Sequence, residues 1–271
     1  MRYFLHIGYD GSKYRGWQRQ AEAKSVQETI EVNLERILKS KVTVYGCGRT
    51  DAGVHASQYT LHINLEEAPA FDLKFRLNKN LPEDIVVYDV ILMEDRQHAR
   101  YDAISRTYDY FIHFNTDPVL NKYSTYLNLE NIEQEPGKIK LDFELMKQAA
   151  TMLIKGKDFR HFCKQPDIHN HTLCEVSNAK LAVNSSKSKM HFTMTANRFL
   201  RGMMRIIVAT LIEVGAKNLS LDNFEKMLNN KGEETEKQPA HPNGLYLSKV
   251  EYPYLNLDEE EGICRLLKGG Y

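Results

Sequence analysis

Hydrophobic residues recur with two different periods along this chain, and segments of the two kinds follow one another from end to end. In residues 2–9 every second side chain is large and apolar or aromatic, which indicates a strand with one buried face. After Ser25, apolar residues recur every three or four positions to about residue 39, which is typical of a helix that begins at a capping serine. We expect further strands at residues 41–45, 58–65, 85–92, 108–112, 176–184, 188–196 and 245–252.

Three more segments have helical spacing. Asp142 caps a helix that stops at Gly156, a long helix begins near Asn197 and ends before Gly215, and a shorter helix follows a cap at Ser220. Because helices and strands are interspersed without a strict strand–helix–strand rhythm, we predict an α+β fold with largely antiparallel sheets.

Polar segments and one boundary complete the predicted organisation. Residues 115–140 contain Pro and Gly and are expected to form a long loop, while residues 230–237 and 258–261 are charged and solvated. A boundary near residues 104–106 divides the chain into two α+β halves, residues 1–104 and 105–271.

Composition and charge exclude several classes of protein. The 36 basic residues balance 36 acidic ones, which argues against a basic coat that binds nucleic acid non-specifically but leaves local basic patches open. Four cysteines without a C-x-x-C pair indicate a reducing compartment, so we expect a cytoplasmic protein. The first residues are broken by charge and do not resemble a signal peptide, and no apolar run is long enough for a membrane helix.

The most unusual segment is G-C-G-R-T-D-A-G-V-H at residues 46–55. Its glycines permit positive φ angles and a close approach of the backbone to a ligand. Asp51 in such a loop either stabilises a turn by accepting hydrogen bonds from nearby N–H groups or takes part in chemistry. Arg49, Thr50 and His55 bring further polar groups to the same short loop, which favours a functional role.

This segment resembles the signature of the TruA-type tRNA pseudouridine synthases, and other blocks of the chain resemble the same family in the family's order over residues 9–252. These blocks are Y-D-G-S-K-Y-R-G-W-Q-R-Q at 9–20, S-V-Q at 25–27, N-K-N-L-P at 78–82, H-A-R at 98–100 with R-T-Y-D-Y at 106–110, G-K-D-F at 156–159, F-L at 199–200 with M-M-R at 203–205, and G-L-Y-L at 244–247.

The resemblance implies a fold and an activity. The family fold has two α+β halves, a mainly antiparallel sheet that crosses both of them, flanking helices and a central cleft. Its members isomerise uridine to pseudouridine in tRNA, at positions 38, 39 and 40 of the anticodon arm, without a cofactor and without a metal. The bacterial type is a homodimer, with one tRNA touching both subunits.

The resemblance also implies roles for three residues. Asp51 is the nucleophile, which attacks either the uracil ring or the anomeric carbon of the ribose. Arg205 is its ion-pair partner; a phosphate contact or a solvated position is the alternative for this arginine. Tyr108 lies over the uracil face and acts at C5. Packing in the core is the alternative for Tyr108, and Tyr110 is the better candidate for such packing.

RNA contacts are expected from local clusters of basic residues. Arg49 would fill the space that the extruded base leaves, because guanidinium planes stack on bases; a bond that ties the loop together is the alternative. A solvated charged surface is the alternative for each cluster. The clusters are Lys13, Arg15 and Arg19 near the first turn, Arg198 and Arg201 on one side of the long helix with Arg205, and Arg100 and Arg106 around the boundary.

Three other interpretations are weighed against the synthase. The first is an RNA-binding protein that kept the fold and lost the chemistry. The second is a hydrolase with Asp51 as phosphoryl acceptor, which would need Mg²⁺ and further carboxylates that the loop does not offer. The third is a zinc site, but the spacing of Cys163, His169, His171 and Cys174 fits no zinc pattern, and a polar loop that touches RNA is favoured there.

Overall fold

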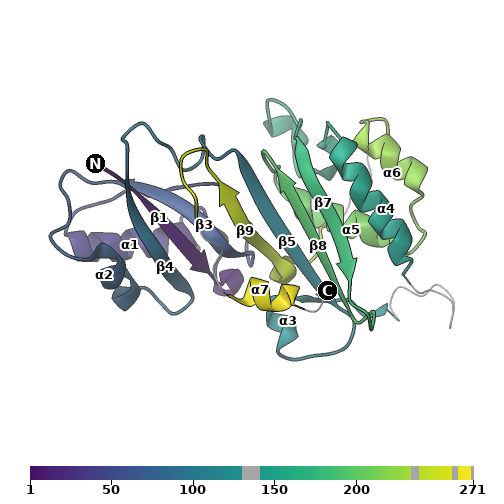
Figure 1. The fold of residues 1–271 in the computed structure, drawn as a ribbon, viewed down its shortest axis with the longest axis horizontal. Coiled ribbons are helices and arrows are strands. Elements are labelled where there is room, and N and C mark those ends of the chain that lie inside the picture. Colours follow the sequence, from purple (N-terminus) through teal and green to yellow (C-terminus); the bar gives the residue numbers. More distant parts are fainter. Residues whose placement is uncertain (130–140, 233–237, 258–261, 270–271) are drawn as a thin grey trace. The chain divides into compact units, whose positions relative to one another are not determined.

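The computed structural model describes residues 1–129, 141–232, 238–257 and 262–269. It divides the chain into two compact units. The first comprises Met1–Ser105 and Tyr246–Leu266, and the second comprises Arg106–Leu245 and Leu267–Tyr271. Both units combine helices with mostly antiparallel strands (Figure 1), so the expected α+β class is confirmed.

In the first unit, strand β1 (Arg2–Tyr9) lies between two antiparallel neighbours, β3 (His55–Asn64) and β4 (Ile85–Met93). The short strand β2 (Tyr45–Gly46) pairs with β3, and β9 (Leu245–Glu251) pairs with β3 in parallel. The buried side chains of β1 and β3 form much of this unit's core, including Phe4, Leu5, Ile7, Tyr59, Leu61 and Ile63.

Two helices of the first unit begin at a side-chain cap. In α1 (Val26–Leu38) the Ser25 hydroxyl accepts the Glu28 N–H at 3.2 Å, as the sequence predicts. In α2 (Leu73–Asn80), which the sequence did not predict, the Asp72 carboxylate accepts the Phe75 N–H at 2.9 Å. The caps at Ser25 and Asp72 satisfy N–H groups that a helix end leaves without a backbone partner. Most of helix α7 (Ile263–Lys268) also belongs to this unit.

One strand prediction is wrong for a definite reason. Residues 41–44 form no strand, and of the predicted segment 41–45 only Tyr45 enters β2. The Val44 N–H and carbonyl are bonded to side chains of α1: Glu31 accepts from the N–H and Gln27 donates to the carbonyl, both at 3.2 Å. These side chains take the place that a neighbouring strand would have.

In the second unit, β8 (Lys189–Ala196) lies between β5 (Ser105–His113) and β7 (Val176–Val183), antiparallel to both. Strand β6 (Thr125–Tyr126) pairs with β5 in parallel and follows the four-residue helix α3 (Leu120–Tyr123). Both α3 and β6 lie inside the segment predicted as a loop.

The three longer helices of the second unit gather on one side of these strands (Figure 1). Helix α4 (Phe143–Met152) contacts β7 and α5 (Met203–Gly215), and α6 (Leu221–Leu228) contacts α4. Asp142 and Ser220 cap α4 and α6, as predicted. The predicted loop residues 130–140 and 233–237 and the acidic residues 258–261 lie outside the described residues.

The long helix begins later than predicted. Gly202, immediately before α5, has φ of 72°, a left-handed conformation that cannot continue an α-helix. The correction concerns the arginines. Only Arg205 lies on α5, while Arg198 and Arg201 lie in the loop before it, so the three do not share one helix side.

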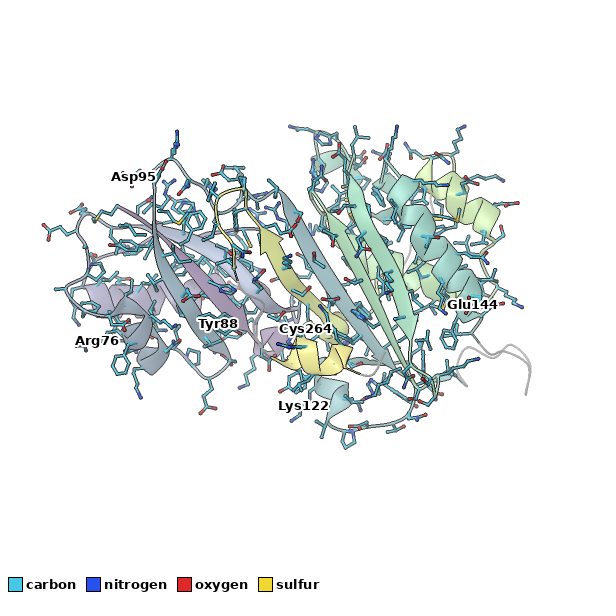
Figure 2. All side chains as sticks on the ribbon, in the orientation of Figure 1. Arg76, Tyr88, Asp95, Lys122, Glu144 and Cys264 are labelled. Carbon is cyan, nitrogen blue, oxygen red and sulfur yellow. The ribbon has the colours of Figure 1, made fainter. Side chains whose placement is uncertain are left out.

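Strands β1 and β4 approach each other closely at Gly8. Tyr88 of β4, labelled in Figure 2, lies over Gly8 of β1: a Cβ atom added there would come within 2.2 Å of the Tyr88 hydroxyl. Across the parts of the chain that the structure describes, no helix has the length and the apolar run needed to span a membrane.

Candidate active site

The segment 46–55 joins β2 to β3, and its first half is bound to β3. The Cys47 N–H donates to the Thr60 carbonyl at 2.8 Å, and the Tyr59 hydroxyl donates to the Gly48 carbonyl at 2.6 Å. Both partners belong to β3, in the middle of the sheet of the first unit. The loop that carries Asp51 therefore begins from a rigid strand.

Asp51 lies in a tight turn of this loop. The Val54 N–H donates to the Asp51 carbonyl at 3.2 Å, and Gly53 takes a positive φ of 76°. The Gly53 N–H donates to the Tyr14 carbonyl at 3.2 Å, which ties the turn to the segment that follows β1. The Asp51 residue is half-buried. Its carboxylate is thus held on a turn whose backbone is fixed on both sides.

Two glycines of the segment after β1 allow the two loops to pack backbone against backbone. A Cβ atom added to Gly11 would lie 1.9 Å from the Val54 carbonyl oxygen, and one added to Gly16 would lie 2.5 Å from the Thr50 carbonyl oxygen. Gly16 also has φ of 92°. The Trp17 N–H then donates to the Thr50 carbonyl at 3.1 Å. The close approach of the two loops therefore requires glycine at both positions.

Aromatic side chains support the loop from behind. The rings of Trp17 and Tyr59 are stacked with centroids 4.1 Å apart, and both side chains are buried. The Tyr9 hydroxyl is 2.8 Å from the Thr50 hydroxyl, directly before Asp51 in the sequence. A dense aromatic layer of this kind resists displacement of the backbone that it covers.

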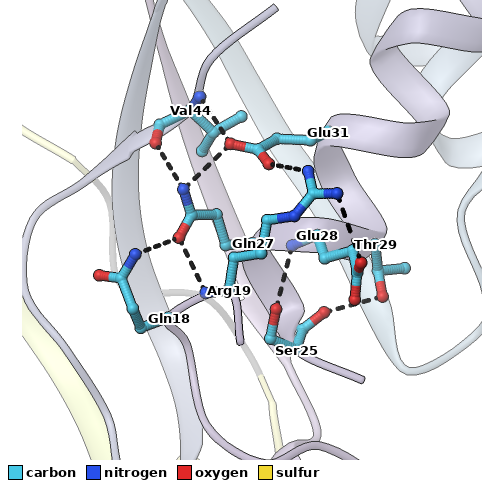
Figure 3. A network of polar contacts seen from close by, with 8 residues as sticks. All are labelled: Gln18, Arg19, Ser25, Gln27, Glu28, Thr29, Glu31 and Val44. Carbon is cyan, nitrogen blue, oxygen red and sulfur yellow. Dashed lines mark hydrogen bonds and ion pairs between the residues drawn. The ribbon is translucent and has the colours of Figure 1, made fainter. Parts of the chain in front are cut away.

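A polar network fixes the approach to the loop (Figure 3). The Gln27 amide donates to the Glu31 carboxylate at 3.0 Å, and its oxygen accepts from the Gln18 amide at 2.9 Å and from the Arg19 N–H at 3.1 Å. With the Val44 bonds described above, this network joins α1 to the segment after β1 and to the residue before β2 (Figure 3). The S-V-Q block therefore contributes a cap and a central amide.

A buried histidine joins the start of β3 to the first turn. His55 Nδ1 lies 3.1 Å from an Asp10 carboxylate oxygen, and the His55 ring is stacked on Tyr246 at 4.7 Å. The hydrogen bond with His55 lowers the pKa of the Asp10 carboxyl, and hydrogen bonds from Ser12 add to this; burial opposes them, but the pKa stays well below its usual range. Asp10 is thus an ionised structural group at neutral pH.

The basic residues of the first unit differ in their surroundings. Arg49 and Arg15 are exposed, and no hydrogen bond or ion pair of either guanidinium occurs within the described residues. Lys13 lies 3.6 Å from Asp84, and Arg19 forms ion pairs with Glu31 at 3.1 Å and Glu28 at 3.6 Å. Arg100 is exposed beside Tyr101.

Tyr108 lies in the second unit, on β5. Its ring meets the Phe199 ring edge to face, with centroids 4.7 Å apart and an interplanar angle of 68°. Tyr108 pairs with Met194 of β8 in the sheet, and its side chain is 9% exposed. Phe199 lies in the loop before α5, a placement that nothing in the sequence signals beyond the F-L block itself.

Tyr110, two residues along the same strand, is 1% exposed. Its hydroxyl donates to the His241 carbonyl at 2.6 Å and lies 2.8 Å from the Thr125 hydroxyl. Burial raises the pKa of this phenol, although the Thr125 hydroxyl and the Arg205 charge oppose the shift. These contacts are those of a core tyrosine, neutral at physiological pH.

Arg205 lies in the first turn of α5 and is half-buried. Its Nε–H donates to the Ala240 carbonyl at 2.6 Å, and the Ala240 N–H donates back to the Arg205 carbonyl at 3.0 Å. This reciprocal pair ties the Arg205 side chain and backbone to Ala240 and limits the orientation of the guanidinium. The sequence offered no signal for Ala240, because a backbone carbonyl is present at every residue.

The remaining arginines of the second unit contact polar groups around α5. Arg106 donates to the Asn197 carbonyl at 3.1 Å, Arg198 lies 3.1 Å from His171, and Arg201 donates to the Gln165 amide oxygen. In the described part of the chain, no three His, Cys, Asp or Glu side chains are grouped so that they could hold a metal ion.

The predicted site residues are divided between the units. Asp51 belongs to the first unit, and Tyr108 and Arg205 belong to the second. Within the second unit, Tyr110 and Arg205 are close enough for the arginine charge to act on the phenol. The predicted ion pair of Asp51 with Arg205 joins the two units and remains a prediction.

Comparison with known proteins gives the family. A profile of the family described as tRNA pseudouridine synthase matches residues 6–102 and 149–253. The chain belongs to the tRNA pseudouridine synthase family. The matched segments contain Asp51 and Arg205, while Tyr108 lies between them. Pseudouridine synthases are isomerases, so the chain is a member of an enzyme family.

Relatives within the tRNA pseudouridine synthases match almost the whole chain. A protein named tRNA pseudouridine synthase A from Porphyromonas gingivalis is 39% identical over 256 residues, which is 93% of this chain and 97% of the relative. A protein of the same name from Bacteroides fragilis is 38% identical over 254 residues, covering 93% of this chain and 96% of the relative. One from Streptococcus gordonii is 33% identical over 255 residues, covering 93% and 98%.

Proposed function

We propose that this chain isomerises uridine to pseudouridine in tRNA, with Asp51 as the nucleophile. One observation supports this most strongly: a half-buried carboxylate lies on a turn that is fixed on both sides, in a chain of the tRNA pseudouridine synthase family. Such fixation keeps a reacting group in one geometry, which is a large part of the catalytic advantage of an enzyme.

The proposed reaction needs no cofactor. The bond between uracil N1 and ribose C1′ breaks, a bond between C5 and C1′ forms, the C5 proton leaves and N1 takes up a proton. Nothing is oxidised or added. A carboxylate suits the nucleophilic step because it is ionised at neutral pH without a partner base and is a good leaving group. Asp51 attacks either the uracil ring or the anomeric carbon.

Arg205 and Tyr108 complete the proposed site. Arg205 is the ion-pair partner of Asp51, and its bond with Ala240 supports this role because the guanidinium has a fixed direction. Tyr108 lies over the uracil face and acts at C5, supported by the edge contact with Phe199, which orients its ring. Tyr110 is a structural neighbour.

The substrate nucleotides lie in the anticodon arm of tRNA. A base stacked in an RNA stem or loop must be extruded before its ring can react. Arg49, exposed two residues before Asp51, fills the vacated position by stacking its guanidinium between the neighbouring bases. Further basic residues hold the RNA backbone: Lys13, Arg15, Arg19, Arg100, Arg106, Arg198 and Arg201.

The proposal also includes a cellular compartment and an oligomeric state. The chain acts in the cytoplasm, supported by its cysteine usage. It acts as a homodimer that binds one tRNA across both subunits, supported by the family resemblance of its sequence blocks. Light scattering coupled to size exclusion tests the dimer: a mass of twice 31.4 kDa agrees with it, and a mass of 31.4 kDa contradicts it.

The activity is tested by incubating unmodified tRNA transcripts with the protein, with EDTA and no added cofactor. Nucleoside analysis after digestion should show pseudouridine rising as uridine falls by the same amount, and carbodiimide mapping should place it in the anticodon arm. Binding of tRNA without conversion would instead identify an inactive RNA-binding protein. Release of phosphate that EDTA abolishes would identify a metal-dependent hydrolase.

A further inference from the structure

The turn at residues 97–102 presents an exposed aromatic ring on the first unit. Tyr101 is 77% exposed, the highest fraction among the exposed large hydrophobic and aromatic side chains of the described residues. Single exposed hydrophobic side chains are common on protein surfaces and need no explanation. The surroundings of Tyr101 distinguish it from such cases.

The turn that carries Tyr101 is held by several hydrogen bonds that involve side chains. The His98 N–H donates to the Asp102 carboxylate at 2.8 Å, and the Arg100 N–H donates to His98 Nδ1 at 3.0 Å. The Tyr254 hydroxyl donates to the same Asp102 oxygen at 2.8 Å. The Asp102 carboxylate therefore stabilises the turn by accepting both hydrogen bonds.

A second set of bonds ties the turn to the sheet. The Ala99 N–H donates to His62 Nδ1 of β3 at 3.2 Å, and the Tyr252 hydroxyl donates to the Ala99 carbonyl at 2.6 Å. An exposed side chain on a turn held in this way has lost part of its freedom before any ligand arrives. That reduces the entropy lost on binding.

Tyr101 is also the exposed end of a series of four rings, which we call the ring ladder: Tyr45, His62, His98 and Tyr101. Tyr45 and His62 are stacked with centroids 4.8 Å apart, His62 and His98 meet edge to face at 4.5 Å, and His98 and Tyr101 lie 4.3 Å apart. The other end, Tyr45, is 43% exposed and precedes Arg49 by four residues. The ring ladder thus belongs to the same unit as Asp51 and begins next to its loop.

The two histidines of the ring ladder are neutral at physiological pH. Burial, together with the charges of His98 and Arg2, lowers the pKa of His62 to about 3. Burial likewise lowers the pKa of His98, with Arg2 adding to the shift and Asp102 opposing it. The ladder therefore presents neutral aromatic faces, and the fixed positive charge beside its exposed end is that of Arg100.

We propose that the Tyr101 end of the ring ladder, together with Arg100, holds an unpaired nucleotide of the tRNA other than the uridine that reacts. This inference rests on the proposed function for the identity of the RNA. Unstacked bases pack on aromatic rings and on guanidinium planes, and the phosphate of the same nucleotide is attracted by a nearby cation. The Arg100 guanidinium lies 6.0 Å from the centre of the Tyr101 ring, so one nucleotide can reach both groups.

The test compares three variants of Tyr101 by filter binding to unmodified tRNA. Tyr101→Ala and Tyr101→Leu remove the aromatic face, and each should weaken the Kd about five- to tenfold. Tyr101→Phe should bind like the wild type, because no hydrogen bond of the Tyr101 hydroxyl occurs in the described residues. Phe75→Ala, which removes another exposed ring, 57% exposed on α2, is the matched control and should leave the Kd unchanged.

Two further measurements separate stacking from charge. Tyr101→Ala should leave the slope of log Kd against log salt unchanged, whereas Arg100→Gln should reduce it by about one. Quenching of 2-aminopurine placed at unpaired positions of the tRNA should be lost at one position in Tyr101→Ala and kept in Tyr101→Phe.

Equal binding of Tyr101→Ala and the wild type would overturn the proposal, as would a Tyr101→Phe variant as weak as Tyr101→Ala. Failure of the proposed function has a different signature. A wild type that binds tRNA without forming pseudouridine would contradict the isomerase, while the Tyr101 series would still decide the stacking site. A preference for a peptide over RNA at this surface would contradict the stacking proposal alone.

Discussion

Carboxylates of this chain are held in different ways. Asp10 is bound to His55 and Ser12, and Asp109 is fully buried against His191 at 2.6 Å and Lys268 at 2.8 Å. Asp51 lies on a turn whose main-chain N–H and carbonyl groups are bonded. The sequence singled out the glycine-rich loop of Asp51 as a candidate site, but it could not predict which backbone groups would hold that loop.

Tyr108 and Tyr110 provide a matched pair for the role of the phenol. Tyr108→Phe removes a hydroxyl that we assign to the chemistry at C5, so kcat should fall by a factor of about 10² or more with little change in stability. Tyr110→Phe removes bonds to Thr125 and His241 and should lower the free energy of unfolding by about 1–2 kcal/mol. Single-turnover rates measure the effect on catalysis, and urea unfolding measures the effect on stability. A loss of stability in Tyr108→Phe together with a loss of rate in Tyr110→Phe would contradict these roles.

Arg49 should act on turnover more than on binding. Arg49→Ala removes the group that we propose stabilises the extruded state, so we expect the single-turnover rate to fall about tenfold or more while tRNA affinity changes about twofold. Arg15→Ala, at another exposed arginine, should weaken affinity and reduce the salt slope instead. Equal losses of rate and affinity in Arg49→Ala would indicate an ordinary phosphate contact.

At the scale of elements, the approach of the two loops depends on Gly16. Gly16→Ala should destabilise the fold by about 1–3 kcal/mol and lower turnover, because φ of 92° is strained for alanine and its Cβ would lie 2.5 Å from the Thr50 carbonyl oxygen. Gly48→Ala is the control, since nothing lies within 4 Å of a Cβ there. Thermal unfolding and kcat compare the variants, and a fully active, stable Gly16→Ala would contradict the packing described.

Three helices with capping side chains were predictable from local sequence, whereas α2 with its Asp72 cap and the elements fixed by distant contacts were not. Ser25, Asp142 and Ser220 each precede an apolar helical repeat, and each caps the expected helix. The start of α5 escaped prediction because the apolar spacing continues through Gly202, where only the backbone angle reveals the break. Residues 41–44 escaped because side chains of α1 replace a strand partner.

At the scale of the whole molecule, the units draw on segments far apart in the sequence. Residues 246–266 belong with the first unit, and β9 pairs with β3 across about 190 residues. No local pattern encodes such a pairing, because strand propensity says where a strand forms and not what lies beside it. The family resemblance predicted an isomerase, while the relation between Asp51 and Arg205 depends on the arrangement of the units.

Acid stability should depend on Asp109. Burial alone would raise the pKa of this carboxyl, but the hydrogen bond and charge of His191 and the charge of Lys268 outweigh it and hold the pKa well below the usual 3.8. A depressed folded pKa means that ionised Asp109 stabilises the fold above its usual pKa, and that this contribution is lost as the pH falls through the folded pKa.

Asp109→Asn should therefore lower the free energy of unfolding at pH 7 by about 3–5 kcal/mol. The variant should also lose stability less steeply than the wild type below about pH 5. Asp95→Asn, at an 81% exposed carboxylate, should follow the wild type at all pH values. Parallel acid curves for Asp109→Asn and the wild type would contradict this linkage.

The most direct measurement is tritium release from tRNA that carries [5-³H]uridine, with wild type and Asp51→Ala compared side by side. Formation of the bond between C5 and the ribose expels the C5 proton, so the wild type should release tritium into water. Asp51→Ala should release none while binding tRNA within about threefold of the wild type. Substantial release by Asp51→Ala would contradict the role of Asp51 as nucleophile, and no release by the wild type would contradict the isomerase itself.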